Sequence, residues 1–348
     1  MNGFYGMRGQ AAAWREALGP NQILVKAAGN SGTDYSAGAN QMATATGDDG
    51  MLLLNGQGLL DMERATRPVG PGGVPSGASV DSPQLPLEAG GSVAALSAVS
   101  REWLSHIMFL DDYDRDFYAD LTQGLVAVDT RRGSAAAAGG LTDPYAGYFD
   151  KGRHMSMRVP LGGGSFLVTG AGEETGGFLG NSLSGLLGSV AASRTAYGLV
   201  NFDRATGDGG GRLFAQLGGG VTQLYPGPAP SLLAASSPVL SSSVALGASH
   251  PLAGGRMGFV VSRPVEMERA VMTYHLPVAR TRDGLVVRES RGIDLAPAIW
   301  ETDFGLFYRR KTRGGALSFE SFVEYRLNAP HAAGAPLIEA GVRLRFRR

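Results

Sequence analysis

The strictest pattern in this 348-residue sequence is the alternation of apolar and polar residues at its C-terminus. Apolar side chains take every second position, at Ile338, Ala340, Val342, Leu344 and Phe346, and charged residues or glycine stand between them. Successive side chains of a β-strand point to opposite faces, so the pattern predicts a strand with one apolar and one polar face. Such a strand belongs to a sheet whose two faces differ in polarity.

The same alternation recurs upstream, in GALSFESFVEYRL (315–327) and FGLFYRRK (304–311). From about residue 154 onward we count roughly eight to ten segments of this kind, separated by glycine or proline, and no helix. The region is therefore predicted to be all-β and antiparallel. Two arrangements fit the pattern: the half-exposed sheet of a soluble protein, and a transmembrane β-barrel with its apolar side chains outward.

Aromatic and basic residues near these strands leave the same two interpretations open. Trp300, Tyr308 and Tyr325 suit the aromatic girdle of a membrane barrel, and they also suit an ordinary sheet. The basic cluster before Gly314 fits a barrel rim facing lipid headgroups or water, and it fits an anionic partner equally well; its members are Arg309, Arg310, Lys311 and Arg313.

The N-terminal region has a different pattern. QAAAWREAL (10–18) and GLLDMERAT (58–66) predict helices, and QILVKAAGN (22–30) predicts a buried strand between them, which is α/β order. A stretch rich in proline and glycine comes next, at 67–91. We therefore expect an α+β protein overall, with a short α/β segment at 1–66, a linker at 67–91 and a β-rich region at 92–348.

Composition excludes several classes of function. The chain has no cysteine, so disulfides, thiolate nucleophiles and cysteine zinc sites are ruled out. Its 31 basic and 31 acidic residues give no net charge, so we expect no nucleic-acid partner. The sequence has no apolar run long enough for a membrane helix, and its first residues, MNGFYGMRGQ, lack the pattern of a signal peptide.

The turn AAGNSG raises the question of what Asn30 does. Its side-chain amide suits the donor of an oxyanion hole, and asparagine beside glycine is equally typical of a turn. About 25 residues later stands LNGQGLLDMERATRPVG (54–70). Together the two segments resemble the oxyanion-asparagine strand and the last protease-domain helix of subtilisin-like serine proteases of the bacterial autotransporter type. IMFLDDYDRDFYADL (107–121) and the β-rich remainder resemble the region after the protease domain in that family.

The resemblance covers only the C-terminal part of that protease. It implies hydrolysis of peptide bonds in a polypeptide substrate, no cofactor, and a location at the outer membrane or cell surface, or outside the cell, with outer-membrane lipid as a partner. By the resemblance Asn30 matches the oxyanion donor. The Asp and His motifs that should precede it are missing, and GANQMATATGDDG (38–50) stands where the nucleophilic serine should be.

An oxyanion donor without a nucleophile and a base leaves little catalysis. We therefore expect a truncated or degenerate subtilase with little or no proteolysis from this chain, in which Asn30 now shapes a turn. The alternative is a non-catalytic outer-membrane or cell-surface β module.

Other motifs predict chemistry only weakly. GNSLSG (180–185) has the wrong spacing for a nucleophile elbow and is interpreted as a turn, and LVTGAGEETGG (167–177) lacks the third glycine and the helix of a dinucleotide site. The five histidines stand singly, at 106, 154, 250, 275 and 331. An aspartate run imitates part of a calcium loop without its glycine and final glutamate, so a hairpin with a solvated corner is expected; the run is Asp112, Asp114, Asp116 and Asp120. We assign no metal or cofactor ligand.

Overall fold

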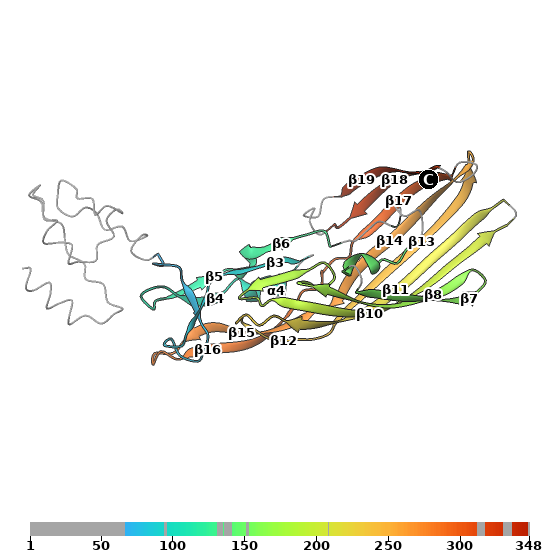
Figure 1. The fold of residues 1–348 in the computed structure, drawn as a ribbon. Coiled ribbons are helices and arrows are strands. Elements are labelled where there is room, and N and C mark those ends of the chain that lie inside the picture. The colour runs from blue at the N-terminus through green and yellow to red at the C-terminus, as the bar shows by residue number, and fades with distance from the viewer. Residues whose placement is uncertain are drawn as a thin grey trace, which may run out of the picture. The chain divides into compact units, whose positions relative to one another are not determined.

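The computed structural model of the chain describes residues 67–93, 96–130, 135, 141–150, 153–207, 209–311, 317–329 and 336–346. Most of these residues belong to β-strands, which form large antiparallel sheets (Figure 1). The expected β-rich character is therefore confirmed. The predicted α/β elements at 10–18, 22–30 and 58–66 lie outside the described residues.

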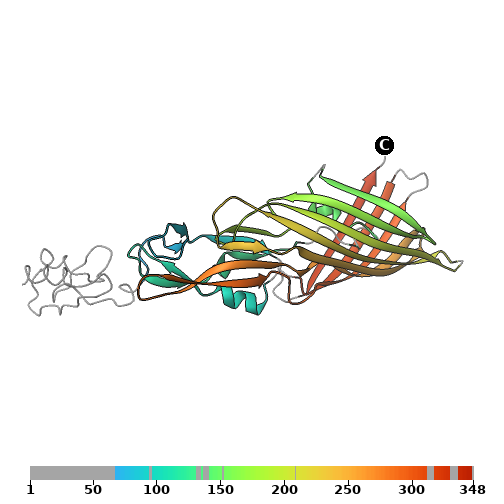
Figure 2. The same ribbon diagram turned by 90° about the horizontal axis from the view of Figure 1, so that it is seen from below.

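Nine strands form one antiparallel sheet, called the large sheet below, in the order β19-β18-β17-β14-β13-β11-β10-β8-β7. Figure 2 shows that this sheet is curved. Its strands are β7 (His154–Gly162), β8 (Ser165–Thr175), β10 (Val190–Thr206), β11 (Gly211–Pro226), β13 (Val239–Leu252), β14 (Gly255–Arg269), β17 (Thr302–Lys311), β18 (Leu317–Leu327) and β19 (Leu337–Phe346). The three alternating segments predicted near the C-terminus are β17, β18 and β19.

The large sheet has two unlike ends. At the turn end, short turns join β7 to β8, β10 to β11 and β13 to β14. The last of these turns places both Ala253 (φ 47°) and Gly254 (φ 73°) in the left-handed region, as a two-residue type I′ hairpin requires. At the opposite, loop end, the connections are long and contain β9 (Ser182–Gly185), β12 (Leu233–Ser236), β15 (Val271–Arg280) and β16 (Val286–Asp294).

Two small sheets are built from these connections. β12, β15 and β16 form one, and β9 joins β3 (Ala89–Val93) and β6 (Leu125–Ala127) in the other. The pairing of β3 with β6 is parallel. With these elements, the described part of the chain has thirteen strands from β7 to β19, which is more than the sequence pattern indicated.

A short helix, α4 (Ala98–Leu104), was not predicted from the sequence. Ser97 caps it by accepting a hydrogen bond from the Ser100 backbone N–H at 3.1 Å. The Ser100 hydroxyl donates to the carbonyl of Asp294 at 2.8 Å, at the end of β16. Leu104 is buried, so one face of the helix and its cap hold it in place.

The segment that precedes the large sheet contains further short elements. β1 (Gly73–Pro75) and β2 (Gln84–Pro86) lie within the proline- and glycine-rich stretch. Two 3-10 turns, η1 (Leu121–Gly124) and η2 (Ala146–Tyr148), come later. The expected hairpin at 107–121 is present as β4 (Ile107–Leu110) and β5 (Asp116–Ala119), and its corner at 112–114 is exposed.

Asp111, which the sequence did not single out, closes the corner of this hairpin. Its carboxylate accepts hydrogen bonds from the backbone N–H groups of Tyr113 and Arg115, both at 3.0 Å, and from that of Val69 at 3.1 Å. It also pairs with the Arg115 guanidinium at 2.6 Å. Burial acts to raise the pKa of Asp111, but the hydrogen bonds from Arg115, Val69 and Tyr113 outweigh it and hold the pKa below its ordinary value.

Candidate functional site: the two faces of the large sheet

The first functional feature is the apolar outer face of the large sheet. Cross-strand partners on this face form an unbroken apolar row over seven neighbouring strands: Phe202, Ala215, Leu246, Val261, Phe304, Tyr325 and Ile338. A parallel row lies one step nearer the turn end: Leu213, Ala248, Phe259, Leu306, Val323 and Ala340. Leu246 is 59% exposed and Ile338 is 69% exposed, so these side chains do not belong to a protein core.

Polar residues mark the limits of this apolar band. On β10 the outward-facing positions between Arg194 and Arg204 are Ala, Gly, Val and Phe. Arg204 lies ten positions after Arg194, which is about 33 Å along a strand, or about 23 Å of height at a tilt of about 45°. That height is close to the apolar band of about 25 Å that encircles outer-membrane barrels. A continuous band of this size on a monomer marks an interaction surface.

The opposite, inner face of the same sheet is buried and carries hydrogen-bonded polar groups beside apolar side chains. The Gln216 side-chain amide donates to Asn201 Oδ1 and to the carbonyl of Thr142, each at 2.7 Å. Nearer the loop end, the hydroxyls of Thr195 and Thr222 lie 2.8 Å apart on neighbouring strands. These polar groups are hydrogen-bonded to one another across the strands, as buried polar groups must be.

A buried arginine is the centre of the charge network on the inner face. The side chain of Arg326 is 1% exposed, and its guanidinium lies 2.5 Å from Glu301 and 3.7 Å from Asp303. It also donates to Asp129 Oδ2 at 2.7 Å. Asp129 comes from the segment before the large sheet, so this ion pair ties that segment to β18.

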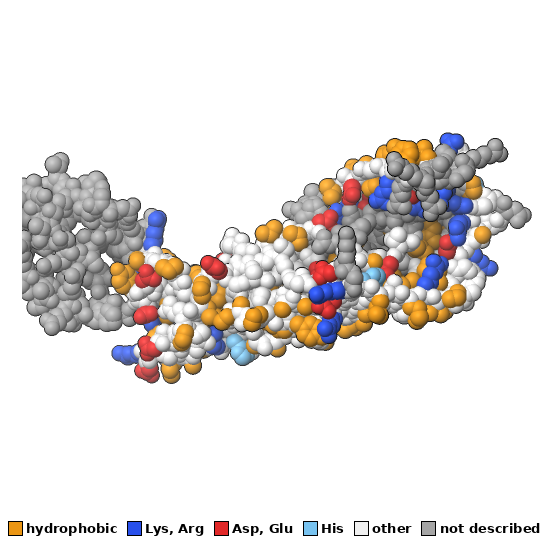
Figure 3. All heavy atoms as spheres, in the orientation of Figure 1, with side chains coloured by type: hydrophobic (Ala, Val, Ile, Leu, Met, Phe, Trp, Pro, Cys, Tyr) orange, Lys and Arg blue, Asp and Glu red, His pale blue; other side chains and the backbone are white. Residues whose placement is uncertain are grey.

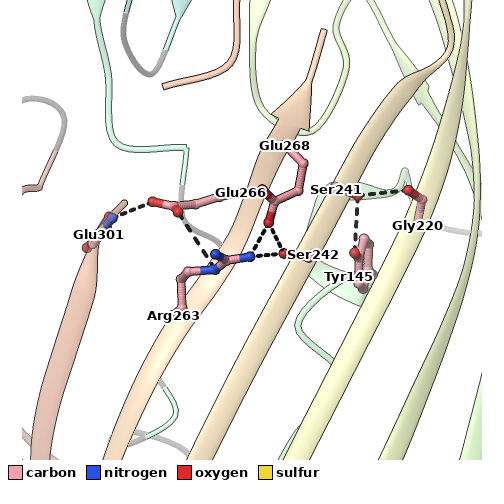
Figure 4. A network of polar contacts seen from close by, with 8 residues as sticks. All are labelled: Tyr145, Gly220, Ser241, Ser242, Arg263, Glu266, Glu268 and Glu301. Atoms are coloured by element: carbon pink, nitrogen blue, oxygen red, sulfur yellow. Dashed lines mark hydrogen bonds and ion pairs between the residues drawn. The ribbon is translucent and has the colours of Figure 1, made fainter. Parts of the chain in front are cut away.

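A short stretch of chain, residues 141–150, lies on the inner face and is called the inner segment below. Its Tyr145 ring stacks on Tyr197 of β10 with centroids 4.6 Å apart, and its hydroxyl lies 3.1 Å from Ser241 Oγ (Figure 4). The Tyr197 hydroxyl donates to Asp143 at 2.5 Å and lies 2.7 Å from His154 Nε2. Three elements therefore meet at the Tyr197 hydroxyl: the inner segment, β7 and β10.

Glycines on the inner face make room for these rings. A Cβ atom added to Gly170 would lie 2.4 Å from the Tyr197 ring, and one added to Gly220 would lie 2.9 Å from the Tyr145 ring. Beyond the rings, Leu141 packs against an apolar cluster on the same face, formed by Phe214, Ala245, Val260 and Phe307. The inner segment is thus held by both polar and apolar contacts.

A second charged network lies on β14 toward the loop end, around Arg263 (Figure 4). Its guanidinium contacts Ser242 and Glu268, and it lies 4.3 Å above the exposed ring of Trp300. Glu266 lies 4.0 Å from the same guanidinium and accepts a hydrogen bond from the backbone N–H of Glu301 at 2.6 Å. Trp300 therefore lies beside Arg263 of β14, with its ring exposed.

The sequence motifs with weak chemical signals have structural roles where the chain is described. Asn30, the oxyanion candidate, lies outside the described residues. Within GNSLSG, Gly180 has a positive φ of 78° and the buried Asn181 donates to the carbonyl of Leu179. This segment is a turn followed by β9, as predicted, and LVTGAGEETGG forms most of β8 and its end.

The histidines and aspartates are dispersed. His106 stacks on Tyr118 with ring centroids 4.1 Å apart, and His154 joins the polar cluster at the Tyr197 hydroxyl. Asp120 accepts hydrogen bonds from Thr122 at the start of η1. Among the described residues, no group of three or more His, Asp or Glu side chains is arranged to hold a metal ion.

Sequence reasoning missed the residues that organise the inner face. Tyr145, Tyr197 and Arg326 carry no motif, because their partners lie up to 197 positions away along the chain. The signal that existed was an arginine at an inward position of a strongly alternating strand.

Comparisons of the chain with protein-family models, with curated proteins and with solved structures found no match. Within the described ranges, no helix is long and apolar enough to cross a membrane.

Proposed function

We propose that this chain acts as an outer-membrane or cell-surface β module whose large sheet contacts lipid through its outer face. The observation that carries the proposal is the pair of apolar rows across neighbouring strands, on the face opposite a buried polar network. A soluble sheet normally shows the reverse arrangement, with apolar side chains buried and polar side chains in water. Apolar residues outward and polar residues inward are the pattern of a sheet that faces lipid.

In this proposal the inner face supplies the stability that lipid cannot. Lipid tails are as apolar as the outer side chains. In a membrane, these side chains would therefore gain little free energy by packing against protein instead of lipid. The hydrogen bonds of Gln216, the stacking of Tyr145 on Tyr197 and the ion pairs of Arg326 then hold the sheet and the inner segment together. In this proposal the large sheet makes lipid contact and takes part in no chemical step.

The absence of cysteine allows a direct test by single labelling. Leu213→Cys and Arg212→Cys introduce a thiol at adjacent residues of β11 that point to opposite faces and are each about half exposed, 48% for Leu213 and 49% for the Arg212 side chain. Each variant is labelled with an environment-sensitive fluorophore and reconstituted into phospholipid vesicles. We expect the label at 213 to be quenched by spin-labelled lipid, and the label at 212 to be quenched by aqueous iodide.

Electrophoresis gives a second readout of the same proposal. A lipid-facing β module that is folded in detergent should migrate differently before and after boiling. An unchanged band, together with quenching of the 213 label by iodide alone, would contradict the proposal and favour a soluble sheet.

The resemblance to subtilases supports a second proposal for residues 1–66. These residues would be the remnant of a protease domain, with Asn30 its former oxyanion donor, and peptide-bond hydrolysis would be lost because no serine nucleophile stands in GANQMATATGDDG. A fluorophosphonate probe should leave the purified chain unlabelled. Labelling of any serine would overturn this second proposal without touching the first.

A further inference from the structure

A basic pocket lies on the inner face at the turn end of the large sheet, beside Leu141 and the apolar cluster of Phe214. Its volume is about 550 Å³. Five cationic side chains from four strands line it, namely Arg158, Arg212, Arg256, Arg309 and Lys311. Figure 3 shows Lys and Arg side chains gathered over this end of the sheet, where Figure 1 places the hairpin turns.

The positive charge of the pocket exceeds its negative charge. Among the described residues that line it, Asp203 is the one carboxylate, and Arg212 neutralises it with two contacts of 2.9 and 2.6 Å. Arg309 lies 3.0 Å from Glu320, which is itself shared with Arg343 at 3.8 Å. After these pairings the pocket keeps a net positive charge.

Two of the arginines are cross-strand partners. Arg256 of β14 and Arg309 of β17 lie directly opposite each other on the same face. Like charges at such positions destabilise a sheet. The Arg256 guanidinium is nevertheless fixed there, because it donates to Ser249 Oγ at 3.1 Å and to the carbonyl of Gly210 at 3.0 Å. An anion bound between the two arginines would relieve the repulsion.

The other cations are less engaged. Lys311 lies two residues beyond Arg309 on the same face, and within the described part of the chain it makes no hydrogen bond or ion pair. Arg158 of β7 lies 3.4 Å above the Phe166 ring, which also lines the pocket. The pocket thus combines free positive charge with an aromatic wall.

We propose that this pocket binds a soluble, multiply charged phosphate compound, with the arginines and Lys311 as its ligands. Guanidinium groups match phosphate oxygens in pairs, which favours phosphate over a single carboxylate. The volume is far larger than one phosphate group needs and falls in the range of small-molecule sites. Because the pocket is on the face opposite the apolar band, the phosphate comes from a solute rather than from a lipid headgroup.

The test is isothermal titration calorimetry of the purified full-length chain in zwitterionic detergent micelles, with sodium tripolyphosphate as the probe. We expect saturable binding of one tripolyphosphate per chain. Lys311→Gln and Arg158→Gln should each weaken the affinity about tenfold, because each removes one charge from direct contact with the anion.

Arg310→Gln is the matched control. It removes the same charge one residue away from Lys311, but Arg310 points to the outer face and is exposed. Its affinity for tripolyphosphate should equal that of the unchanged chain. Circular dichroism first establishes that all variants are folded like the unchanged chain. If Arg310→Gln and Lys311→Gln then weaken the affinity for tripolyphosphate equally, or if no saturable binding is found, the proposal is overturned.

A second arm separates the two sources of phosphate. Anionic lipid is added to the micelles before the titration. An unchanged affinity for tripolyphosphate supports a soluble ligand. If the lipid instead competes with tripolyphosphate, and this competition is lost in Lys311→Gln, the site binds a lipid headgroup and the assignment is overturned. Neither result depends on the labelling experiment at residues 212 and 213, so this proposal can fail while the lipid-facing outer face stands.

Discussion

Replacing Leu246 with arginine distinguishes a lipid-facing sheet from a soluble one. Leu246 lies on β13 midway along the apolar band, since the outward positions four residues to either side are the polar Ser242 and His250. It is 59% exposed, so in water Leu246→Arg should change the free energy of unfolding by no more than about 0.5 kcal/mol. At the centre of a bilayer the same change costs about 2 to 4 kcal/mol.

Leu252→Arg is the matched control on the same strand and the same face. Leu252 lies six positions after Leu246, which is about 20 Å along the strand and about 14 Å of depth at a tilt of about 45°. In a bilayer centred on Leu246, Leu252 would lie at the interface, where arginine costs only about 0 to 1 kcal/mol. Both free energies of unfolding are measured by urea titration from phospholipid vesicles, followed by tryptophan fluorescence.

The reasoning requires a difference between the two variants. A loss of about 2 kcal/mol or more for Leu246→Arg, with little loss for Leu252→Arg, agrees with a lipid-facing band. Equal, small losses for both variants would refute it, because an exposed soluble strand has no depth dependence.

The inner face and the hairpin corner give three further predictions. Gly170→Ala should destabilise the sheet, because the added methyl group collides with the Tyr197 ring. Gly198→Ala is the control, because a Cβ atom at this position meets no atom within 4 Å. Urea unfolding of the two variants checks the difference in stability. Arg326→Met should cost about 3 to 5 kcal/mol in the same assay, because it leaves buried carboxylates without their cation, and a cost below about 1 kcal/mol would contradict the network. The pKa of Asp111 is lower in the folded chain than in the unfolded chain, so its ionised carboxylate stabilises the fold above the unfolded-state pKa. This stabilisation is lost as the pH falls through the folded-state pKa. Faster amide exchange at the hairpin corner below about pH 4, absent in Asp111→Asn, would confirm the prediction.

Strict alternation made part of the fold predictable from sequence. In β19, apolar residues occupy every second position from Ile338 to Phe346, so the pattern determines which side chains share a face and which register is allowed. β17 and β18 follow a similar alternation, so their outward residues and their last residues could be predicted, while each strand begins two residues away from the predicted start. The hairpin at 107–121 was readable for another reason, since its aspartate-rich corner separates two short apolar runs.

Other strands could not be recognised from the sequence, because small residues occupy the positions of one face and weaken the alternation of apolar and polar residues. In β13, SSSVALGASH places serine, alanine and glycine inward, and these residues show no contrast with their neighbours in a hydrophobicity pattern. β14 contains register shifts relative to β13 near Val244, which break its period. The short helix α4 escaped notice because its stability comes from the Ser97 cap and from tertiary packing rather than from helical periodicity.

The candidate site was less predictable than the fold. The polarity of each face could be inferred, but the pairing of Arg326 with Glu301, or of Arg256 opposite Arg309, depends on which strands become neighbours. β14 and β17 are adjacent in the sheet although two further strands separate them along the chain. No local pattern carries that information.

The strand count of the large sheet has a topological consequence. Because the nine strands formed by the described residues alternate in direction, the two outermost of them, β7 and β19, run the same way. Joining these margins would create one parallel seam in an otherwise antiparallel cylinder, while any all-antiparallel ring would need an odd number of additional strands. In lipid, where an unpaired backbone margin is not tolerated, the direction of these two strands thus decides which kinds of closure the chain can adopt.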